Sequence, residues 1–187
     1  MKELIAEAVG VLKAGGVILY PTDTVWGIGC DDTNPEAVAT VFEIKKRSEA
    51  KSLVLLAADL DMVARYIRQI PSIAIDLVEV NDAPMTIVYP GAQGLAPAVV
   101  AEDGSVGIRI PHNEFCVELA RRLRAPIVST SANISGEPTP TKYSEIAPQI
   151  IQAVDWCAPR RLEAGSTGRA SQIIKLGLRG EVEVLRP

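Results

Sequence analysis

A short apolar strand that runs directly into polar residues is the feature that most constrains this chain. The strand is "VILY" at 17–20, and "PTDTVWGIGCD" at 21–31 follows it without a break. Four apolar residues, two of them β-branched, predict a buried strand, and the proline after them is expected to stop its hydrogen-bonded ladder. Polar groups next to a core need hydrogen-bond partners. Thr22, Asp23 and Thr24 therefore either tie down their own loop or hold a ligand.

Size and composition favour one globular domain over residues 1–187. The chain has 187 residues, of which 48% are hydrophobic, and that is enough for a real core. No apolar run reaches the roughly 18 residues of a membrane span, and the amino-terminal segment mixes acids and a lysine into its apolar pattern. We therefore expect a cytoplasmic protein with no membrane partner. The formal charge of −4 argues against wholesale coating of nucleic acid but leaves room for a local basic pocket.

Helical and strand patterns mix along the chain without strict alternation. We expect strands at 17–20, 53–57, 85–89, 105–110, 126–130, 171–176 and 181–185. We expect helices over 4–12, over about 72–80 and near 142–152. Three more are expected to begin at a capping residue: from Asn34 to the basic run at 45–47, from Asp59 to near 71, and from Asn113 to about 123. This mixture predicts an α/β fold with a twisted, mixed β-sheet flanked by helices.

The sequence predicts no metal site and no catalytic triad. Its three cysteines, at positions 30, 116 and 157, lie far apart, and His112 is its only histidine. Without a CxxC pair or a His/Cys cluster, structural zinc is not expected, and the cysteines are interpreted as small buried hydrophobic residues. His112 sits in the polar stretch "PHNEF" and is interpreted as a surface or capping residue rather than a base.

The basic run "KKRSEAK" permits two interpretations. It supplies Lys45, Lys46, Arg47 and Lys51. Cations at the end of a helix complement its dipole and are usually solvated. Alternatively, the arginine fork and the lysine point charges form a phosphate clamp.

Three further segments are candidates for a site. "STSANISG" at 129–136 places a dense set of hydroxyl and amide groups after a buried strand, which favours a ligand over local turns alone. In "SVGIRIP", strand alternation sends Arg109 to the face opposite Ile108 and Ile110, so it faces either solvent or a site. The glycine-rich "EAGSTGRASQIIKL" at 163–176 is either a mobile lid or a long surface connection.

The order of these segments resembles the YrdC family over essentially the whole chain. The matching segments are "PTDTVWGIGCD", "KKRSEAKSL", "SVGIRIP", "VSTSANISG", "SQIIKL" and the final "VLRP". The K-x-R and S-x-N pattern of the family corresponds to Lys45, Arg47, Ser131 and Asn133. Each short motif is weak alone, but the ordered combination is highly specific, and it looks like the short bacterial form.

The resemblance implies a YrdC-like fold around a basic cavity, and it implies a reaction. ATP, L-threonine and bicarbonate would give threonylcarbamoyl-AMP and pyrophosphate, with Mg²⁺ on the triphosphate. Downstream threonylcarbamoyl-transferase proteins would then modify tRNA next to the anticodon.

The resemblance also implies roles for individual residues. The catalytic set would be Lys45, Arg47, Ser131 and Asn133. ATP would contact Arg47, Lys51, Ser105, Asn133, Thr141 and Arg186. Threonine would contact Thr24, Arg109, Ser131 and Ser171. No residue is assigned to a protein-bound metal.

Three departures from the family pattern keep alternatives open. The chain reads "NDAPMTIV" at 81–88, has Ser48 where a proline is usual, and has "ASQI" at 170–173. These loops bear on substrate closure, so a paralogue that acts on another amine is one alternative. An RNA-binding module, or weak binding of RNA or tRNA beside the enzyme activity, is the other. Few aromatic residues and an acidic total charge speak against an RNA-binding surface.

Overall fold

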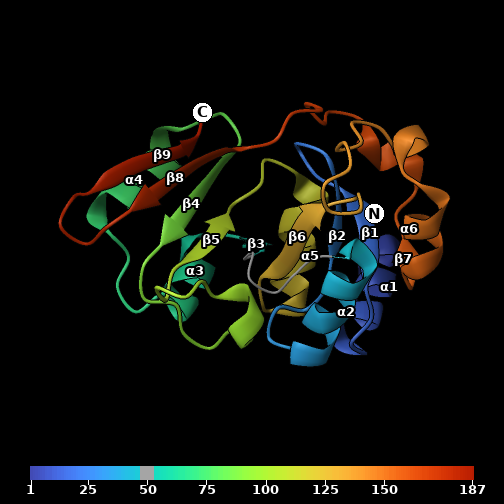
Figure 1. Ribbon diagram of the computed structural model, residues 1–187, viewed down its shortest axis with the longest axis horizontal. Helices are drawn as coiled ribbons and strands as arrows, with labels where there is room; N and C mark the ends of the chain where they lie inside the picture. The colour runs from blue at the N-terminus through green and yellow to red at the C-terminus, as the bar shows by residue number, and fades with distance from the viewer. Residues whose placement is uncertain (47–52) are drawn as a thin grey trace.

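One mixed sheet runs through the protein and carries its helices on both faces and at both ends (Figure 1). The computed structural model describes residues 1–46 and 53–187. The strands lie in the order β7-β1-β2-β6-β3-β5-β4-β8-β9. Their bounds are β1 (Ile18–Pro21), β2 (Trp26–Gly29), β3 (Val54–Leu56), β4 (Met85–Tyr89), β5 (Val106–Arg109), β6 (Ile127–Ser131), β7 (Trp156–Cys157), β8 (Gln172–Leu176) and β9 (Val182–Arg186). The pairs β1–β7, β3–β5 and β4–β8 are parallel, and the other neighbours are antiparallel. The expected α/β fold with a mixed sheet is confirmed.

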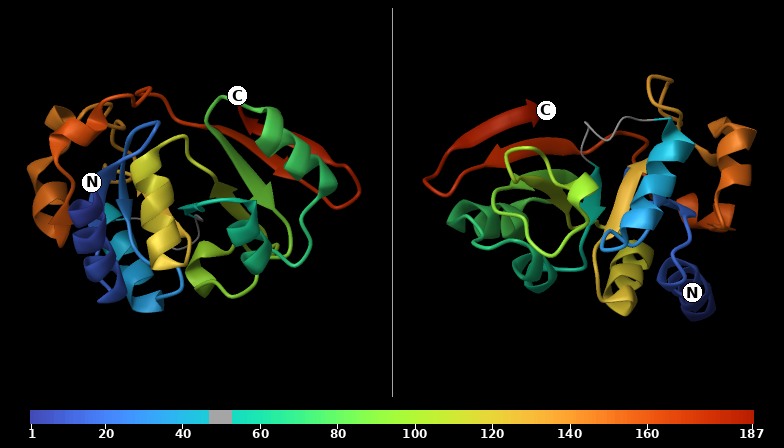
Figure 2. Two further views of the ribbon diagram at one scale, coloured as in Figure 1. Left: turned by 180° about the vertical axis from the view of Figure 1, so that it is seen from behind. Right: turned by 60° about the horizontal axis from the view of Figure 1, so that its bottom comes forward.

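The helices divide between the two ends of the sheet. Their bounds are α1 (Lys2–Lys13), α2 (Pro35–Lys45), α3 (Leu60–Tyr66), α4 (Ser72–Val80), α5 (Glu114–Leu123) and α6 (Pro148–Ala153), with 3₁₀ turns η1 (Pro97–Val99), η2 (Tyr143–Glu145) and η3 (Arg160–Glu163). Helices α3 and α4 lie toward the β4–β8–β9 end, and the other four lie toward the β1–β7 end (Figures 1 and 2). Helices α1 and α5 lie side by side.

Apolar spacing explains how these helices pack. Helix α1 buries Ile5, Ala8, Val9 and Leu12, which recur on one face of a helix with 3.6 residues per turn. The predicted caps of three other helices are confirmed, because the side chains of Asn34, Asp59 and Asn113 each accept a backbone N–H in the first turn.

Strand β2 differs from the sequence-based expectation, which places its residues in the loop after 17–20. It pairs with β1 on one side and β6 on the other. Gly29 permits this close approach, since a Cβ there would lie 2.3 Å from the carbonyl oxygen of Val128. The chain thus turns back sharply after Pro21, which is itself the last residue of β1 and pairs with Trp26. The ladder therefore includes the proline rather than stopping before it.

Two predicted helices are shorter than expected. The helix expected over 142–152 is a 3₁₀ turn followed by α6, which begins at Pro148. Proline lacks an N–H and suits the first turn of a helix, so the helix starts there rather than passing through it. The helix that starts after Asp59 ends at Tyr66, because Ile67 is extended and forms an isolated bridge with Ala92.

The three cysteines do not pair with one another. Cys30 and Cys116 are buried, as expected, Cys157 is half-buried, and all three are free thiols. Within residues 1–46 and 53–187, no helix is both long enough and apolar enough to cross a membrane.

Candidate active site

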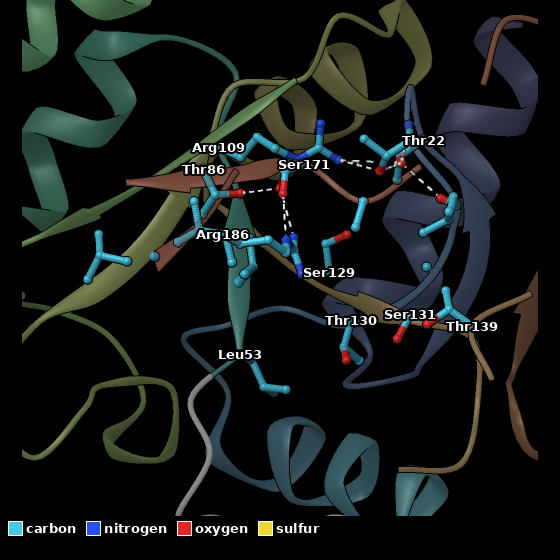
Figure 3. A pocket seen from close by; sticks show the side chains of 18 of the residues that line it. Thr22, Leu53, Thr86, Arg109, Ser129, Thr130, Ser131, Thr139, Ser171 and Arg186 are labelled. Carbon is cyan, nitrogen blue, oxygen red and sulfur yellow. Dashed lines mark hydrogen bonds between the residues drawn. The ribbon is translucent and has the colours of Figure 1, made fainter. Parts of the chain in front are cut away.

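A cavity of about 360 Å³ lies against the central strands (Figure 3). Its described lining comes from β2, β3, β4, β5, β6, β8 and β9, from the turn before β2 and from loop residues next to these strands. Six predicted site residues line it: Thr24, Ser105, Arg109, Ser131, Ser171 and Arg186. The cavity therefore collects residues that lie up to 164 positions apart in the sequence, from Thr22 to Arg186.

The threonines after β1 both fasten their loop and face the cavity. The hydroxyls of Thr22 and Thr24 lie 2.9 Å apart, and the Thr22 hydroxyl also donates to the Val25 carbonyl at 2.8 Å. Thr22 and Thr24 are buried, yet both line the cavity. The two interpretations of this polar cluster are thus compatible: one set of hydroxyls shapes the loop and is presented to the cavity.

Arg109 at the end of β5 lies inside the protein. Its side chain is 3% exposed, and Nη1 donates to Oδ1 of Asp23 at 2.5 Å. Nη2 lies 3.4 and 3.3 Å from the hydroxyls of Thr22 and Thr24. The solvent-facing interpretation of Arg109 is therefore wrong, because the loop after β1 covers the face of the strand to which alternation sends this side chain.

Arg186, from the last strand, reaches the same cavity (Figure 3). Its Nε donates to the carbonyl of Ser171 at 2.7 Å, and the Ser171 hydroxyl lies 2.7 Å from that of Thr86. Burial, and next the positive charge of Arg109, lower the pKa of the Arg186 guanidinium. Arg109 and Arg186 are the only charged residues in the described lining, so this part of the cavity suits an anion.

Ser105, the residue before β5, is held by a surface carboxylate. Its backbone N–H and its hydroxyl both donate to Oδ1 of Asp103, at 3.0 and 2.5 Å. The Lys175 ammonium donates to the other oxygen at 2.6 Å. The bond from Lys175, followed by the bonds from Ser105, holds the pKa of the Asp103 carboxyl well below its usual range. Ser105 is thus fixed at the cavity wall.

Lys45, at the end of α2, is buried against the end of β6. Its ammonium donates to the carbonyls of Ser131 at 2.6 Å and Asn133 at 2.8 Å, with the Asn133 side-chain oxygen at 3.3 Å. Lys45 is 2% exposed, so the solvated interpretation of the basic run is wrong for this residue, whereas Lys46 is exposed. The lysine joins α2 to the strand end that lines the cavity.

Not every predicted site residue lies in the cavity wall. Lys45, Asn133 and Thr141 are outside the described lining. The Asn133 amide donates to the Glu137 carbonyl at 2.7 Å, and the Thr141 N–H and hydroxyl donate to one oxygen of Glu145 at 2.7 and 3.0 Å. Arg47 and Lys51 lie outside the described residues.

The segment that begins at Glu163 is bonded to the loop after β1. Thr167 and Gly168 donate their N–H groups to the carbonyls of Asp23 and Thr24, at 2.9 and 2.8 Å, and the Ser166 hydroxyl donates to the carbonyl of Thr22. A simple surface connection is therefore the wrong interpretation for 163–168.

Sequence reasoning missed several residues that build this site. Glu163 accepts hydrogen bonds from Trp26 Nε1 at 2.5 Å and from the Tyr143 N–H at 2.6 Å. Thr86 and Thr139 line the cavity. Thr86 had a signal, because it is a polar residue inside the apolar strand "MTIVY". The role of Glu163 had none, since its partners are remote in sequence.

The described residues offer no protein metal site. Among residues 1–46 and 53–187, no group of three or more His, Cys, Asp and Glu side chains is arranged to hold a metal ion. His112 is exposed, in keeping with its interpretation as a surface residue.

Comparison with known proteins agrees with this architecture. A Sua5/YciO/YrdC family model, described as telomere recombination, matches residues 10–187. A protein of Stenotrophomonas maltophilia named threonylcarbamoyl-AMP synthase is 36% identical over 159 residues, which cover 83% of this chain and 86% of that protein. A protein of Chromohalobacter salexigens with the same name is 31% identical, with 80% and 82% covered.

Solved structures give the same result. P. abyssi Sua5, in a structure described as complexed with L-threonine, superposes with a TM-score of 0.81 at 27% identity, covering 92% of this chain. The match covers 50% of Sua5, so the chain spans about half the length of that protein. E. coli YciO shares the fold with a TM-score of 0.81 at 23% identity, covering 100% of this chain and 89% of its own. The chain belongs to the Sua5/YciO/YrdC family.

Proposed function

We infer that the protein is a threonylcarbamoyl-AMP synthase, an enzyme of the transferase type that acts on ATP. Bacterial relatives at 31–36% identity over most of the chain carry this name. The observation that carries the assignment to a site is the cavity itself, because its described lining places Arg109 and Arg186 among hydroxyl groups. L-Threonine, bicarbonate and ATP are the proposed substrates.

We assign the threonine end of the cavity to the loop after β1. Arg109 would bind the carboxylate of threonine, since a guanidinium gives charge-assisted bonds to a carboxylate and keeps donors beyond the one used by Asp23. Thr24, Ser171 and Ser131 would contact the rest of the amino acid. Their hydroxyls donate and accept, which suits both its ammonium and its hydroxyl group.

We assign the nucleotide to the remaining wall and to the loops beside it. Arg186 and Ser105 would contact ATP from the cavity wall. Asn133 and Thr141 would contact it from outside the described lining, together with Arg47 and Lys51. Lys45 would act with Arg47, Ser131 and Asn133 at the reacting centre, where its present bonds hold the end of β6.

The chemistry needs no covalent nucleophile from the protein. Threonine and bicarbonate would give an N-carboxylated threonine with loss of water, as the C–N bond forms and a C–O bond of bicarbonate breaks. An oxygen of the new N-carboxylate then attacks the α-phosphorus of ATP. The new P–O bond forms as the bond to pyrophosphate breaks. The protein would contribute by holding the two reactants in line and by placing arginine charge near the developing negative charge.

Mg²⁺ would arrive with the triphosphate. The described lining contains no carboxylate, so we assign no protein ligand to this ion and no step depends on one.

The product would pass to threonylcarbamoyl-transferase proteins that modify tRNA in the cytoplasm. Direct RNA binding stays a prediction, with Trp26 as the single aromatic residue of the described lining.

The test is pyrophosphate release by the purified protein in Mg-ATP and bicarbonate, with one amino acid added at a time. We expect release with threonine and little with serine, valine or no amino acid. Release that is greater with another amine would identify a paralogue with a different substrate. Release that ignores the amino acid would contradict the proposal.

A further inference from the structure

Asp23 lies between the two cavity threonines but does not itself line the cavity. Thr22 and Thr24 are in the described lining, whereas Asp23 is not, and it is 5% exposed. Both oxygens of its carboxylate are in use. Oδ1 accepts the bond from Arg109 Nη1 at 2.5 Å, and Oδ2 accepts the backbone N–H of His112 at 2.9 Å.

The bond to Asp23 is the short, charged contact of Arg109. The other bonds of this guanidinium run to the two threonine hydroxyls at 3.3–3.4 Å and are correspondingly weaker. A guanidinium carries five N–H donors in a fixed plane, so fixing Nη1 also fixes the direction in which the remaining donors point. Asp23 thereby sets the orientation of Arg109.

The backbone of Asp23 is also held in place. Thr167 donates its N–H to the Asp23 carbonyl at 2.9 Å, and the neighbouring Gly168 does the same to Thr24 at 2.8 Å. Together with the His112 N–H, these contacts fix the carboxylate from two other parts of the chain. The carboxylate that orients Arg109 is therefore itself anchored.

Asp23 also reduces the repulsion between the two positive charges of the cavity. Arg109 and Arg186 line the same cavity, and the charge of Arg109 disfavours the charged form of Arg186. An unpaired buried guanidinium would be costly, so a carboxylate behind Arg109 lets the cavity hold both cations before an anionic substrate arrives.

We propose that Asp23 is a positioning residue, which aims the Arg109 guanidinium at the carboxylate of the amino-acid substrate. This rests on the proposed function, in which Arg109 binds the threonine carboxylate. Asp23 acts only through Arg109, because its two oxygens are occupied and its side chain is outside the described lining.

The experiment is a double-mutant cycle on the full chain. Wild type, Asp23→Asn, Arg109→Ala and the double variant are assayed for pyrophosphate release with threonine and ATP varied in turn, and thermal unfolding is recorded. Asp23→Asn is expected to raise the KM for threonine at least tenfold and to change the KM for ATP less than twofold. The double variant is expected to match Arg109→Ala, since Asp23 has nothing left to orient.

Asp155→Asn is the matched control, because this carboxylate also accepts a backbone N–H, that of Val17 at 2.8 Å, away from the cavity lining. It should leave both KM values unchanged. If Asp23→Asn fails to fold, Asp23→Glu takes its place, because it keeps the charge but moves the carboxylate away from Nη1 of Arg109. It should raise the KM for threonine and leave that for ATP nearly unchanged, and a normal threonine KM in this variant would overturn the proposal.

The outcomes separate the two proposals. A wild type without threonine-dependent release contradicts the proposed function itself. With an active wild type, a normal threonine KM in Arg109→Ala or Asp23→Asn overturns the positioning role. So does a double variant whose KM lies threefold or more above that of Arg109→Ala, or a parallel rise of both KM values with a lowered Tm.

Discussion

At the scale of single residues, two arginines share one cavity but are held differently. Arg109 is paired with the Asp23 carboxylate, whereas Arg186 is bonded to the neutral carbonyl of Ser171. Within the described site, a carboxylate therefore neutralises the charge of Arg109 but not the charge of Arg186. We expect the two residues to serve different substrates.

Substituting each arginine tests this division. Arg109→Ala should weaken threonine binding by about 1.5–3 kcal/mol, the size of a charge-assisted bond, and should leave ATP binding little changed. Arg186→Ala should do the reverse. Calorimetric titration of each ligand checks this, with Arg121→Ala as a control, because Arg121 is an exposed arginine paired with Glu118. Equal losses for both ligands would show that the residues are not divided between substrates.

Adjacent lysines offer a matched pair for stability. Lys45 is buried and binds two carbonyls, while Lys46 is exposed. Lys45→Met should lower the free energy of unfolding by about 1.5–3 kcal/mol, because bonds from a charged group are lost and two half-buried carbonyls lose their donor. Lys46→Met should stay within about 0.5 kcal/mol. Denaturant unfolding measures both, and equal small effects would contradict the structural role of Lys45.

The burial of Asp32 should make the free energy of unfolding depend on pH. This residue is 0% exposed, and neither carboxylate oxygen has a hydrogen-bond partner among residues 1–46 and 53–187. Burial, and next the charge of Asp31, raise the pKa of the Asp32 carboxyl well above its usual value. The folded state therefore holds a proton that the unfolded chain releases near pH 4, the usual range for aspartate. The stability from that proton is complete below this pH and is lost as the pH rises through the folded-state pKa.

The Asn variant isolates this effect. The free energy of unfolding of Asp32→Asn relative to wild type should rise with pH, by at most about 1.4 kcal/mol per pH unit for one proton. Asp61→Asn, which removes an exposed carboxylate in the first turn of α3, should run parallel to wild type. Chemical denaturation from pH 4 to 9 measures the differences. A constant difference between Asp32→Asn and wild type would show that Asp32 is ionised throughout.

At the scale of elements, the sequence predicts the helix caps and strands that depend on residues close together in the chain. The caps at Asn34, Asp59 and Asn113 and the apolar runs of β1 and β4 were expected, since each depends on a few adjacent side chains. Strand β2 was missed because glycine is a weak strand former, and Gly29 is required by close contact with β6, which is remote in sequence.

The site shows the same limit. The sequence indicated Thr24, Arg109, Ser131, Ser171 and Arg186, and all of them line the cavity. It left Arg109 between solvent and site, because only the tertiary fold places the loop after β1 over β5. It interpreted the basic run as one unit, whereas the burial of Lys45 depends on the end of β6.

The bonds around Glu163 make an element-scale prediction. Glu163 joins Trp26 to Tyr143 at the base of the segment that fastens the loop after β1. Glu163→Ala should speed hydrogen exchange of the Thr167 and Gly168 amides about tenfold, because roughly 1.4 kcal/mol of local stability would be lost. Glu137→Ala, at an exposed site, should not. Exchange unchanged in Glu163→Ala would show that the segment is held by its backbone bonds alone.

At the scale of the whole molecule, residues from the central strands and the last strand of one sheet form a common cavity wall. The chain has a formal charge of −4, yet the charged residues of the described cavity lining are both arginines. Positive charge is thus a local property of the described lining rather than of the chain as a whole. Two arginines without a carboxylate in the same lining are the arrangement expected for an anionic substrate.

The most direct test of this account follows a labelled carbon into the product. The protein is incubated with Mg-ATP, L-threonine and ¹³C-bicarbonate, and the nucleotide products are analysed by mass spectrometry. The account predicts threonylcarbamoyl-AMP that carries one labelled carbon, formed in step with pyrophosphate and absent when threonine or bicarbonate is left out. ATP cleavage that yields only unlabelled AMP or ADP would contradict it.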